Sequence, residues 1–402
     1  MQQNRRDFLA ATAIATLAGP GTAVAQAQTS SAAVETAQAE TAAPPAEAAE
    51  RVYAAPTQVK EISIVNLRAL QAEAQKVIPA GGFASIAGGA GDEWTMREDQ
   101  EAFYRYPIHP RIVTGHADPD LSTTLLGTHI PMPLIVTPMA GHGLAHASAE
   151  VGTAKGADAA GTIFVAPLLS NVTMEEIAQA STGPKWFQIY LPADRGLSRE
   201  LLGRAKAAGY KAVIVTADSF VPGNRETLKR SGFHDPLPQA NYPPEIRGHG
   251  SPQKHDLGWD DIDFVREETG LPVIVKGVLS PDVALMALEH GVAAIQVSNH
   301  GGRQLDEVPA TITILPQIAD AVSGRVPIIL DSGLRRGQDV FKALALGASA
   351  VALGRPILYG LALGGWMGVR DVLNHIKGEF EMVMQLAGVA SVKEISRRNL
   401  YV

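Results

Sequence analysis

Short apolar runs alternate with longer segments of mixed polarity over much of the chain, from Pro133 to Leu353. Runs of this kind, rich in Val, Ile and Ala, are typical of buried parallel strands, and the segments between them have helical character. The pattern therefore predicts eight successive strand and helix units. The expected strands cover residues 134–137, 162–166, 186–190, 212–216, 273–276, 293–297, 327–330 and 350–353.

Helices are expected between these strands, at 173–180, 198–208, 281–290 and 338–346, and several of them end next to a glycine, as helix C-caps often do. An open, doubly wound sheet is the competing arrangement, but eight units in about 230 residues fit an eightfold barrel better. We therefore predict an α/β fold, a (β/α)8 TIM barrel with a helical extension at its N-terminal side.

Polar residues gather where the predicted strands end, which is where barrel enzymes place their chemistry. Each of them alone would fit a solvated strand end, but so many on one face of the barrel favour a functional site. From the third strand to the eighth they are Gln188 and Tyr190, Thr216 and Asp218, Lys276, His300 and Arg303, Asp331 and Arg335, and Arg355.

The segment that follows the sixth strand, Ser-Asn-His-Gly-Gly-Arg-Gln-Leu-Asp at 298–306, carries the most specific chemistry. His300 is a candidate general base, and the Arg303 fork can hold a carboxylate in a bidentate grip. Together they suit the oxidation of a 2-hydroxy acid. The alternative is a purely structural role, in which Gly301 and Gly302 form a tight turn beside a histidine that takes no part in catalysis.

The loops after strands seven and eight form the usual phosphate site of barrel enzymes. Gly333 and Arg335 follow the seventh strand, and Gly354 and Arg355 follow the eighth, so a phosphorylated cofactor is expected there. Arg336 is interpreted as a surface charge. A lysine at a buried strand end, such as Lys276, needs an anionic partner, and an electron-accepting ring would supply one.

Composition narrows the classes of function. The chain has 402 residues and a net charge of -7, and its basic residues are scattered, which argues against a nucleic-acid partner. It contains no cysteine, which excludes disulfides, thiolate metal sites and haem attachment through cysteine. No metal site is predicted.

The N-terminus predicts export. Arg5 and Arg6 precede Phe8 and Leu9, a mild apolar run follows, and Ala-Val-Ala at 23–25 has the pattern of a cleavage site. We interpret residues 1–25 as a twin-arginine signal peptide, 26–58 as a flexible linker rich in Ala, Thr, Glu and Pro, and 59–402 as the barrel domain. Because the twin-arginine machinery carries folded proteins, this predicts a periplasmic protein that binds its cofactor before export.

Several further sequence motifs support the interpretation as a hydroxy acid oxidising enzyme. They are Pro-Ala-Gly-Gly-Phe at 79–83, Gly-Asp-Glu-Trp at 91–94, His-Gly-Leu-Ala-His at 142–146, Trp-Phe-Gln-Ile-Tyr at 186–190 and Leu-Gly-Gly-Trp at 363–366. With the strand-end residues, they make the chain from about Lys60 onward resemble the FMN-dependent 2-hydroxy acid oxidising family. Within that family the motifs are most similar to those of the bacterial L-lactate oxidases.

The resemblance implies a role for each candidate residue. His300 would be the base, either for the hydroxyl proton in hydride transfer or for the α proton in a carbanion scheme, with Asp218 as its partner. Arg303 and Arg225 would hold the substrate carboxylate, and Tyr190 would bond the substrate oxygen. The residues implied to hold FMN are Pro138, Met139 and Ala140 behind the ring, Gln188, Thr216 and Lys276 at its polar edge, and Asp331, Gly333, Arg335, Gly354 and Arg355 around the ribityl phosphate.

Three positions depart from the family pattern. Ser85 stands where a carboxylate-binding Tyr is usual, Pro167 where a Ser commonly bonds the flavin, and Leu169 where lactate oxidase has a second Tyr. Smaller and more apolar side chains predict a substrate bulkier than lactate. The aperiodic segment 231–257 is similar to the family's mobile lid, and Tyr242 within it is either a substrate contact or a solvated loop residue.

The resemblance therefore implies an FMN enzyme that oxidises an L-2-hydroxy acid and passes electrons to oxygen or to a quinone, assembled as a homotetramer. Three alternatives remain open at this point. One is a monooxygenase that decarboxylates its product, another is an isomerase that uses reduced flavin, and the third is a flavin-binding protein without catalysis.

Overall fold

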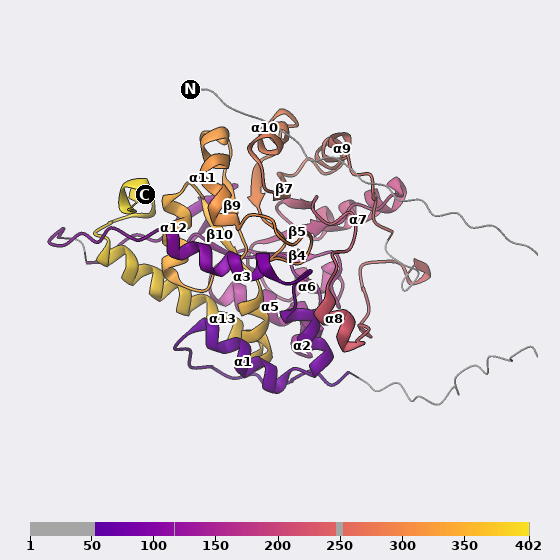
Figure 1. Ribbon diagram of the computed structural model, residues 1–402. Coiled ribbons are helices and arrows are strands. Elements are labelled where there is room, and N and C mark those ends of the chain that lie inside the picture. The colour runs from indigo at the N-terminus through magenta and orange to yellow at the C-terminus, as the bar shows by residue number, and fades with distance from the viewer. Residues whose placement is uncertain (1–52, 116, 247–251, 402) are drawn as a thin grey trace, which may run out of the picture. The chain divides into compact units, whose positions relative to one another are not determined.

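A closed barrel of eight parallel strands lies at the centre of the computed structural model, which describes residues 53–115, 117–246 and 252–401 (Figure 1). The strands follow chain order around the barrel, and the last one closes it against the first. They are β3 (Leu134–Val136), β4 (Phe164–Pro167), β5 (Lys185–Ile189), β6 (Val213–Thr216), β7 (Val273–Val278), β8 (Ala294–Val297), β9 (Ile328–Leu330) and β10 (Ala350–Leu353). All eight predicted strands are confirmed.

Helices connect and cover the strands, and the four helices predicted from the sequence are confirmed as α6, α7, α10 and α12. α13 bends where Gly364 and Gly365 leave helical geometry. The helices of the barrel domain are α4 (His142–Ala145), α5 (Ala149–Ala159), α6 (Met174–Gln179), α7 (Arg195–Ala207), α8 (Glu226–Ser231), α9 (Trp259–Thr269), α10 (Pro281–Glu289), α11 (Thr311–Val322), α12 (Gly337–Ala345) and α13 (Arg355–Leu386), with short 3-10 turns η2 (Pro244–Ile246), η3 (Val392–Glu394) and η4 (Arg397–Asn399).

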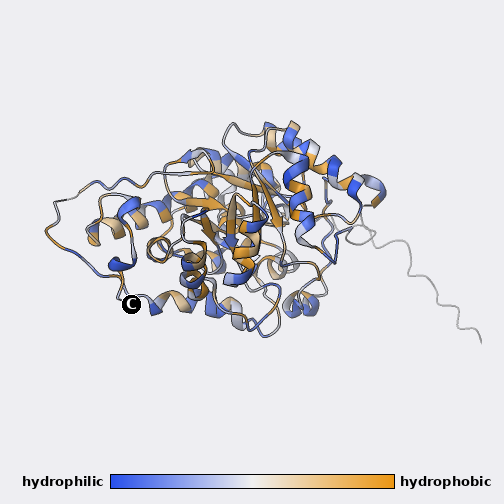
Figure 2. Cartoon of the chain, turned by 90° about the horizontal axis from the view of Figure 1, so that it is seen from above, coloured by the Kyte–Doolittle hydropathy of each residue, from blue (hydrophilic) through white to orange (hydrophobic). Residues whose placement is uncertain are grey.

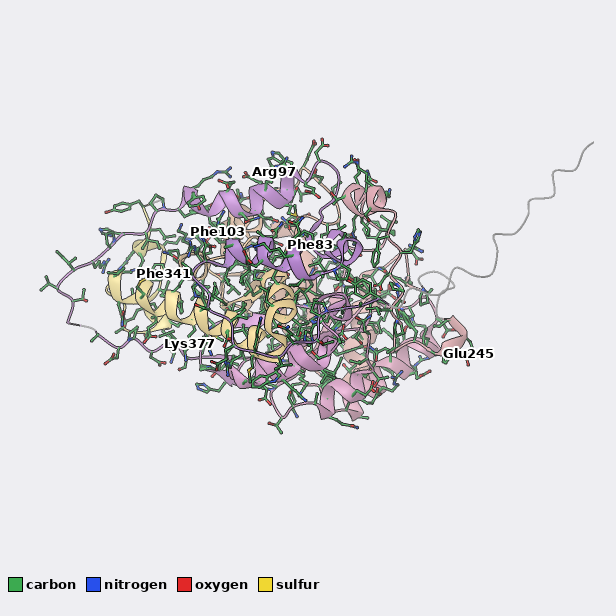
Figure 3. The ribbon with its side chains drawn as sticks, turned by 90° about the horizontal axis from the view of Figure 1, so that it is seen from below. Phe83, Arg97, Phe103, Glu245, Phe341 and Lys377 are labelled. Carbon is green, nitrogen blue, oxygen red and sulfur yellow. The ribbon has the colours of Figure 1, made fainter. Side chains whose placement is uncertain are left out.

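The predicted N-terminal helical extension is also confirmed. It consists of α1 (Leu67–Val77), α2 (Ala80–Ala87), α3 (Trp94–Glu101) and η1 (Ala102–Arg105). Asn66 begins α1 as an N-cap, because its side chain accepts a hydrogen bond from the backbone of Arg68. Phe103 of η1 and Phe341 of α12, both labelled in Figure 3, belong to the same buried apolar cluster.

The barrel interior changes from apolar to polar along the strands. Every strand contributes to a buried apolar cluster at the same level of the barrel, through Ile135, Val165, Trp186, Ile214, Ile274, Ala294, Ile329 and Ala352. Side chains two positions further along a strand face the same side. Those residues are Thr137, Pro167, Gln188, Thr216, Lys276, Gln296, Asp331 and Gly354, so the strand ends place most of the polar groups of the site in one layer.

The opposite end of the barrel is closed by an antiparallel hairpin of β1 (Thr123–Leu125) and β2 (Thr128–Ile130). Leu125 and Ile130 belong to the same apolar cluster as the interior strand residues. The hydrophobic strands lie inside, and the helices carry polar residues on their outer faces (Figure 2). Among the described residues, no helix is long and apolar enough to cross a bilayer.

Tyr53 and Pro56, which belong to the predicted linker, are held by hydrogen bonds to the barrel domain. Tyr53 donates a hydrogen bond from its hydroxyl to the carbonyl of Leu144, at 2.8 Å. The backbone of Ala147 donates to the carbonyl of Pro56, also at 2.8 Å. A stretch with few large apolar residues is therefore held by hydrogen bonds, which composition does not reveal. The predicted signal peptide and the rest of the predicted linker lie outside the described residues.

Gly333 allows the loop after β9 to approach α3, and we predict that this position is unusually intolerant. Its φ of +82° disfavours any L side chain, and an added Cβ would overlap the backbone carbonyl of Asp99. Gly324 has a similar φ of +72° but open space around it. Gly324→Ala should cost about 1–2 kcal/mol of stability from backbone strain alone. Gly333→Ala should cost about 1–3 kcal/mol more from overpacking.

Thermal unfolding of the two variants beside the parent protein checks this. A larger drop in Tm for Gly333→Ala than for Gly324→Ala is the expected result. Equal drops would show that the loop moves away from α3 without cost.

Candidate active site

His300 and Asp218 form a partly buried pair at the carboxyl end of the barrel, as the sequence predicts. Asp218 follows β6 and His300 follows β8, and His300 Nδ1 lies 2.9 Å from Asp218 Oδ1. The hydroxyl of Tyr190 lies 3.5 Å from His300 Nε2. Because Nδ1 faces a carboxylate, it carries the hydrogen, which leaves Nε2 free to accept a proton.

Unusual backbone geometry presents His300 to the site. Residues 300, 301 and 302 all have positive φ, at 61°, 65° and 69°, so the chain makes a left-handed turn here. The two glycines adopt this conformation without strain, whereas His300 adopts it at a steric cost. The side chain of Asn299 holds this turn by accepting a hydrogen bond from Gly302 N at 3.1 Å. Gly277, with a φ of +107°, leaves room for the side chain of Asp218, because a Cβ at position 277 would collide with it.

Lys276 supplies a cation on the other side of Asp218. Its Nζ lies 3.8 Å from Asp218 Oδ2 and has no hydrogen-bond partner among the described residues. Burial lowers the pKa of Lys276, but the charges of Asp218 and Asp331 more than offset this and raise the pKa. Burial alone would raise the pKa of Asp218, yet Lys276 and His300 hold that pKa at about 2. Lysine and aspartate are therefore both charged.

The same charges weaken protonation of the histidine. Burial lowers the pKa of His300, and the positive charge of Lys276 lowers it further, although Asp218 acts in the opposite direction. The net pKa lies below its usual value, so His300 is neutral at neutral pH. A neutral imidazole with a free Nε2 is the form that a general base requires.

A cavity beside the pair brings together most of the residues expected around the flavin ring. Gln188 is fixed within it, because its Nε2 donates to Thr216 Oγ1 at 2.9 Å and its Oε1 accepts from Leu168 N at 3.3 Å. The cavity is lined by Pro138, Met139, Ala140, Pro167, Gln188, Tyr190, Thr216, Lys276 and His300.

Four arginines near this cavity are satisfied by neutral partners rather than by carboxylates. Arg303 and Arg355 both donate to carbonyls at the end of α2, and Arg225 donates to the carbonyl of Arg303 and to Gln304 Oε1. Arg335 donates to the carbonyl of Leu334. Within the described part of the chain, no carboxylate lies within ion-pair distance of any of the four.

Burial is the main influence on the pKa of each of these arginines. It lowers the pKa of Arg225, Arg303 and Arg355, and for Arg303 the neighbouring Arg225 and Arg355 lower the pKa further. Burial and the charge of Arg355 lower the pKa of Arg335 to about 10. Arg335 is buried and the other three arginines are partly buried, and cations withdrawn from water without counter-ions are costly, so the site is suited to anions. Guanidinium forks suit both carboxylate and phosphate.

The loop after β9 brings Arg335 close enough to Arg355 for the charge of Arg355 to lower the pKa of Arg335, and the phosphate site expected here stays a prediction. Arg336 points elsewhere and pairs with Glu379 at 2.6 Å. Asp331 Oδ2 accepts hydrogen bonds from Gln296 Nε2 at 2.6 Å and from Thr137 Oγ1 at 3.2 Å. The predicted contact of Asp331 with the cofactor stays a prediction. A carboxylate can accept a hydrogen bond from a ribityl hydroxyl, but it repels the phosphate.

Two buried polar residues were missed by the sequence analysis. Gln296 lies inside β8, in an apolar run. Alternate residues of a strand face the same side, so its spacing of two from Ser298 is the only sequence signal that it faces the barrel interior. Asp99 of α3 accepts a hydrogen bond from Asn299 Nδ2 at 2.6 Å and thereby supports the turn at His300. Nothing in the local sequence of α3 indicates that this carboxylate is buried.

The predicted lid is anchored over part of its length. Asn241 Oδ1 accepts from Met174 N at 2.8 Å, and Asn241 Nδ2 donates to the carbonyl of Leu168 at 2.9 Å. Tyr242 is buried, with 2% of its surface exposed, and burial and the nearby Tyr190 raise its pKa. The interpretation of Tyr242 as a solvated loop residue is therefore wrong.

The three departures from the family pattern occupy different places. Pro167 lines the cavity. The carbonyl of Ser85 accepts a hydrogen bond from Arg303 at 2.8 Å, so position 85 is next to the predicted carboxylate clamp. Leu169 is partly buried and packs against the main apolar cluster. Within the described ranges, no cluster of His, Asp and Glu side chains has the arrangement of a metal site.

A (β/α)8 barrel with a partly buried, neutral histidine, a lysine beside it and arginines without carboxylate partners is suited to an anionic, ring-bearing cofactor. Comparison with known proteins agrees with this. The sequence profile of the family "FMN-dependent dehydrogenase" matches residues 74–402. The chain belongs to this family, and it is an FMN-dependent oxidoreductase.

Relatives of known activity cover most of the chain. An L-lactate oxidase from Lentilactobacillus hilgardii is 43% identical over 351 residues, which are 85% of this chain and 95% of the relative. Glycolate oxidase from Spinacia oleracea is 39% identical over 354 residues, 84% of this chain and 96% of the relative.

Solved structures agree with the sequence relatives. The crystal structure of a Pediococcus acidilactici lactate oxidase is similar with a TM-score of 0.84 at 43% identity, covering 87% of this chain and 97% of the other. The structure of a mandelate oxidase is similar with a TM-score of 0.80 at 37% identity, covering 84% and 98%.

Asp99 should make stability depend on pH. Burial raises its pKa to about 7, against the opposing hydrogen bonds from Asn299 and Thr311; the charge of Asp331 raises it further and that of Arg355 lowers it. A carboxyl whose pKa is raised on folding holds its proton in the folded state after the unfolded chain has lost it. Asp99 therefore costs increasing stability as pH rises from about 4 towards 7.

Asp99→Asn removes this titration, so its Tm relative to the parent should improve steadily between pH 4 and pH 7. Thermal unfolding at several pH values measures the difference. Asp320→Asn, at an exposed position on α11 where Asp320 pairs with Arg397, is the control for loss of a surface carboxylate. A parallel course of the Asp99→Asn and parent curves would contradict the burial of a protonated carboxyl.

Proposed function

We propose that this protein oxidises an (S)-2-hydroxy acid to the 2-oxo acid, with His300 as the base and with Arg303 and Arg225 holding the carboxylate. The observation that carries the proposal is geometric: His300 Nδ1 lies 2.9 Å from Asp218 Oδ1, which leaves Nε2 to accept a proton, and no carboxylate among the described residues pairs with Arg303 or Arg225. The activities of the relatives, which include lactate, glycolate and mandelate oxidases, support it.

Each residue has a distinct part in the proposed reaction. The two arginines fix the carboxylate and so orient the hydroxyl-bearing carbon. Tyr190 donates a hydrogen bond to the substrate oxygen, and His300 Nε2 takes the hydroxyl proton. Asp218 stabilises the imidazolium that results, and Lys276 keeps Asp218 ionised. When bound, FMN accepts the two electrons and the hydrogen that leave the substrate carbon, and oxygen or a quinone then takes the electrons.

The residues proposed to hold FMN follow from the same geometry. Gln188 and Thr216 lie at the polar edge of the cavity with Lys276, and Pro138, Met139 and Ala140 form its apolar wall. Gly333, Arg335, Gly354 and Arg355 would bind the phosphate. We also propose export by the twin-arginine machinery to the periplasm, on the strength of Arg5 and Arg6 and the motif at 23–25, and a homotetrameric assembly by likeness to the family.

The proposed substrate is bulkier or more apolar than lactate, because Ser85 and Leu169 are smaller than tyrosine. Anaerobic stopped-flow mixing of the holoenzyme with lactate, 2-hydroxyoctanoate and mandelate, followed by bleaching of the flavin absorbance, tests both the reaction and this preference. The longer or aromatic acids should reduce the flavin with the higher kcat/KM. No bleaching by any of them would contradict hydroxy acid oxidation, and lactate as the best substrate would contradict the preference.

A substitution at position 85 isolates the missing hydroxyl. Ser85→Tyr should improve kcat/KM for lactate by about 10-fold or more, because a hydrogen bond to a charged group contributes about 1.5–3 kcal/mol. Ser85→Phe adds the ring without the hydroxyl and should bring no such gain. Re-oxidation of the reduced enzyme by air or by a soluble quinone then identifies the electron acceptor.

The pH dependence of the reaction tests the acid–base pair. In the parent protein kcat/KM should rise with pH through the pKa of His300, which lies below 6.5. Asp218 raises that pKa, so Asp218→Asn should move the acidic limb to lower pH. It should also lower the plateau by about 100-fold or more, since the imidazolium loses its partner. An acidic limb that stays in place in Asp218→Asn would show that another group is the base. Asp320→Asn, at an exposed position outside the site, is the control and should leave the pH profile unchanged.

A further inference from the structure

The hydroxyl of Tyr359 is buried and lacks a hydrogen-bond partner among the described residues. The side chain belongs to the second turn of α13 and is 1% exposed. Leaving such a group unpaired costs about 1–3 kcal/mol, so an unpaired phenol inside a well-packed domain indicates that a partner is supplied from outside the chain.

The ring of Tyr359 is held in one position. It stacks on Phe83 of α2, labelled in Figure 3, with ring centroids 6.3 Å apart and an angle of 27° between the planes. Tyr359 follows Arg355 by one helical turn, so the two side chains share a face of α13. Helical side chains slant toward the N-terminus of their helix, which directs the phenol toward the first turn, where Arg355 and Gly354 lie.

The surroundings of the hydroxyl are cationic. Burial raises the pKa of Tyr359, whereas the charges of Arg355, Arg335 and Arg303, in decreasing order, lower it, and the net pKa is raised. The phenol therefore keeps its proton and can only act as a neutral donor toward an anion held by these arginines. The two stronger influences come from the arginines that we assign to the cofactor phosphate, and the weakest comes from the substrate clamp.

We propose that the hydroxyl of Tyr359 donates a hydrogen bond to the phosphate of FMN, between Arg335 and Arg355, and so helps the chain select a phosphorylated flavin. This inference rests on the assignment of those two arginines to the phosphate in the proposed function. It makes Tyr359 a specificity-determining residue for the cofactor rather than a residue of the chemical step.

Two flavins separate the phosphate from the ring. Riboflavin has the same ring and ribityl chain as FMN but no phosphate. The full-length holoenzyme is dialysed against graded concentrations of FMN, or of riboflavin until the FMN has been exchanged, and bound flavin is measured by fluorescence. Tyr359→Phe should weaken FMN binding by about 10-fold or more, the effect of one hydrogen bond to a charged group, and leave riboflavin binding unchanged.

Tyr210→Phe is the matched control. Its hydroxyl is also buried but donates to the carbonyl of Met174 at 2.9 Å, away from the phosphate loops. This variant should lower the Tm without altering the ratio of FMN to riboflavin affinity, which shows that the loss of a buried phenol alone does not change flavin selection.

Every other outcome overturns the proposal. Unchanged FMN affinity in Tyr359→Phe, or equal losses for both flavins, would mean that the hydroxyl does not contact the phosphate. Unchanged flavin binding with a raised KM for the hydroxy acid would place the phenol at the Arg303 clamp instead. A parent protein that binds both flavins equally would refute the phosphate site itself. None of the binding measurements requires turnover, so failure of the proposed reaction would be seen separately.

Discussion

An excess of buried and partly buried positive charge at the mouth of the barrel is the constraint on which the rest of the structure depends. Lys276, Arg225, Arg303, Arg335 and Arg355 lie around one site, and Asp218 is the only carboxylate among the described residues within ion-pair distance of any of them. Unpaired buried cations cost several kcal/mol each unless hydrogen bonds or ligands compensate them. Anionic ligands, such as the phosphate and the carboxylate that we propose for this site, would relieve this cost.

The N-terminal extension provides the compensation that the chain itself can offer. α2 ends so that the carbonyls of Ser85, Ile86 and Gly88 point at Arg303 and Arg355, where the negative end of the helix dipole also favours a cation. α3 supports the turn at His300 through Asp99 and Asn299. The extension therefore orients the charged groups of the barrel rather than merely covering it.

The sequence predicted the elements well and the buried polar network poorly, for a physical reason. Strand runs such as 350–353 are recognised because a parallel sheet buried on both faces needs continuous apolar residues. A single polar residue in such a run, such as Gln296, does not fit the apolar pattern. Only the alternation of side chains along the strand in the structure shows that it faces the barrel interior. The interpretation of Tyr242 as a solvated residue failed because packing against distant parts of the chain buries it, and Tyr53 is likewise held by a distant partner, the carbonyl of Leu144. Local pattern carries no information on such contacts.

The acid–base pair responds to what binds beside Lys276. That lysine lowers the pKa of His300, while Asp218 between them raises it. A negatively charged group next to Lys276 offsets the lysine charge, so the pKa of His300 rises toward its ordinary value and the imidazole becomes a stronger base. Because the interior has a low dielectric constant, this effect is larger than it would be in water. This effect needs a full negative charge beside Lys276: an oxidised flavin ring is neutral and would leave the pKa of His300 low, whereas a reduced, anionic ring at that place would raise it.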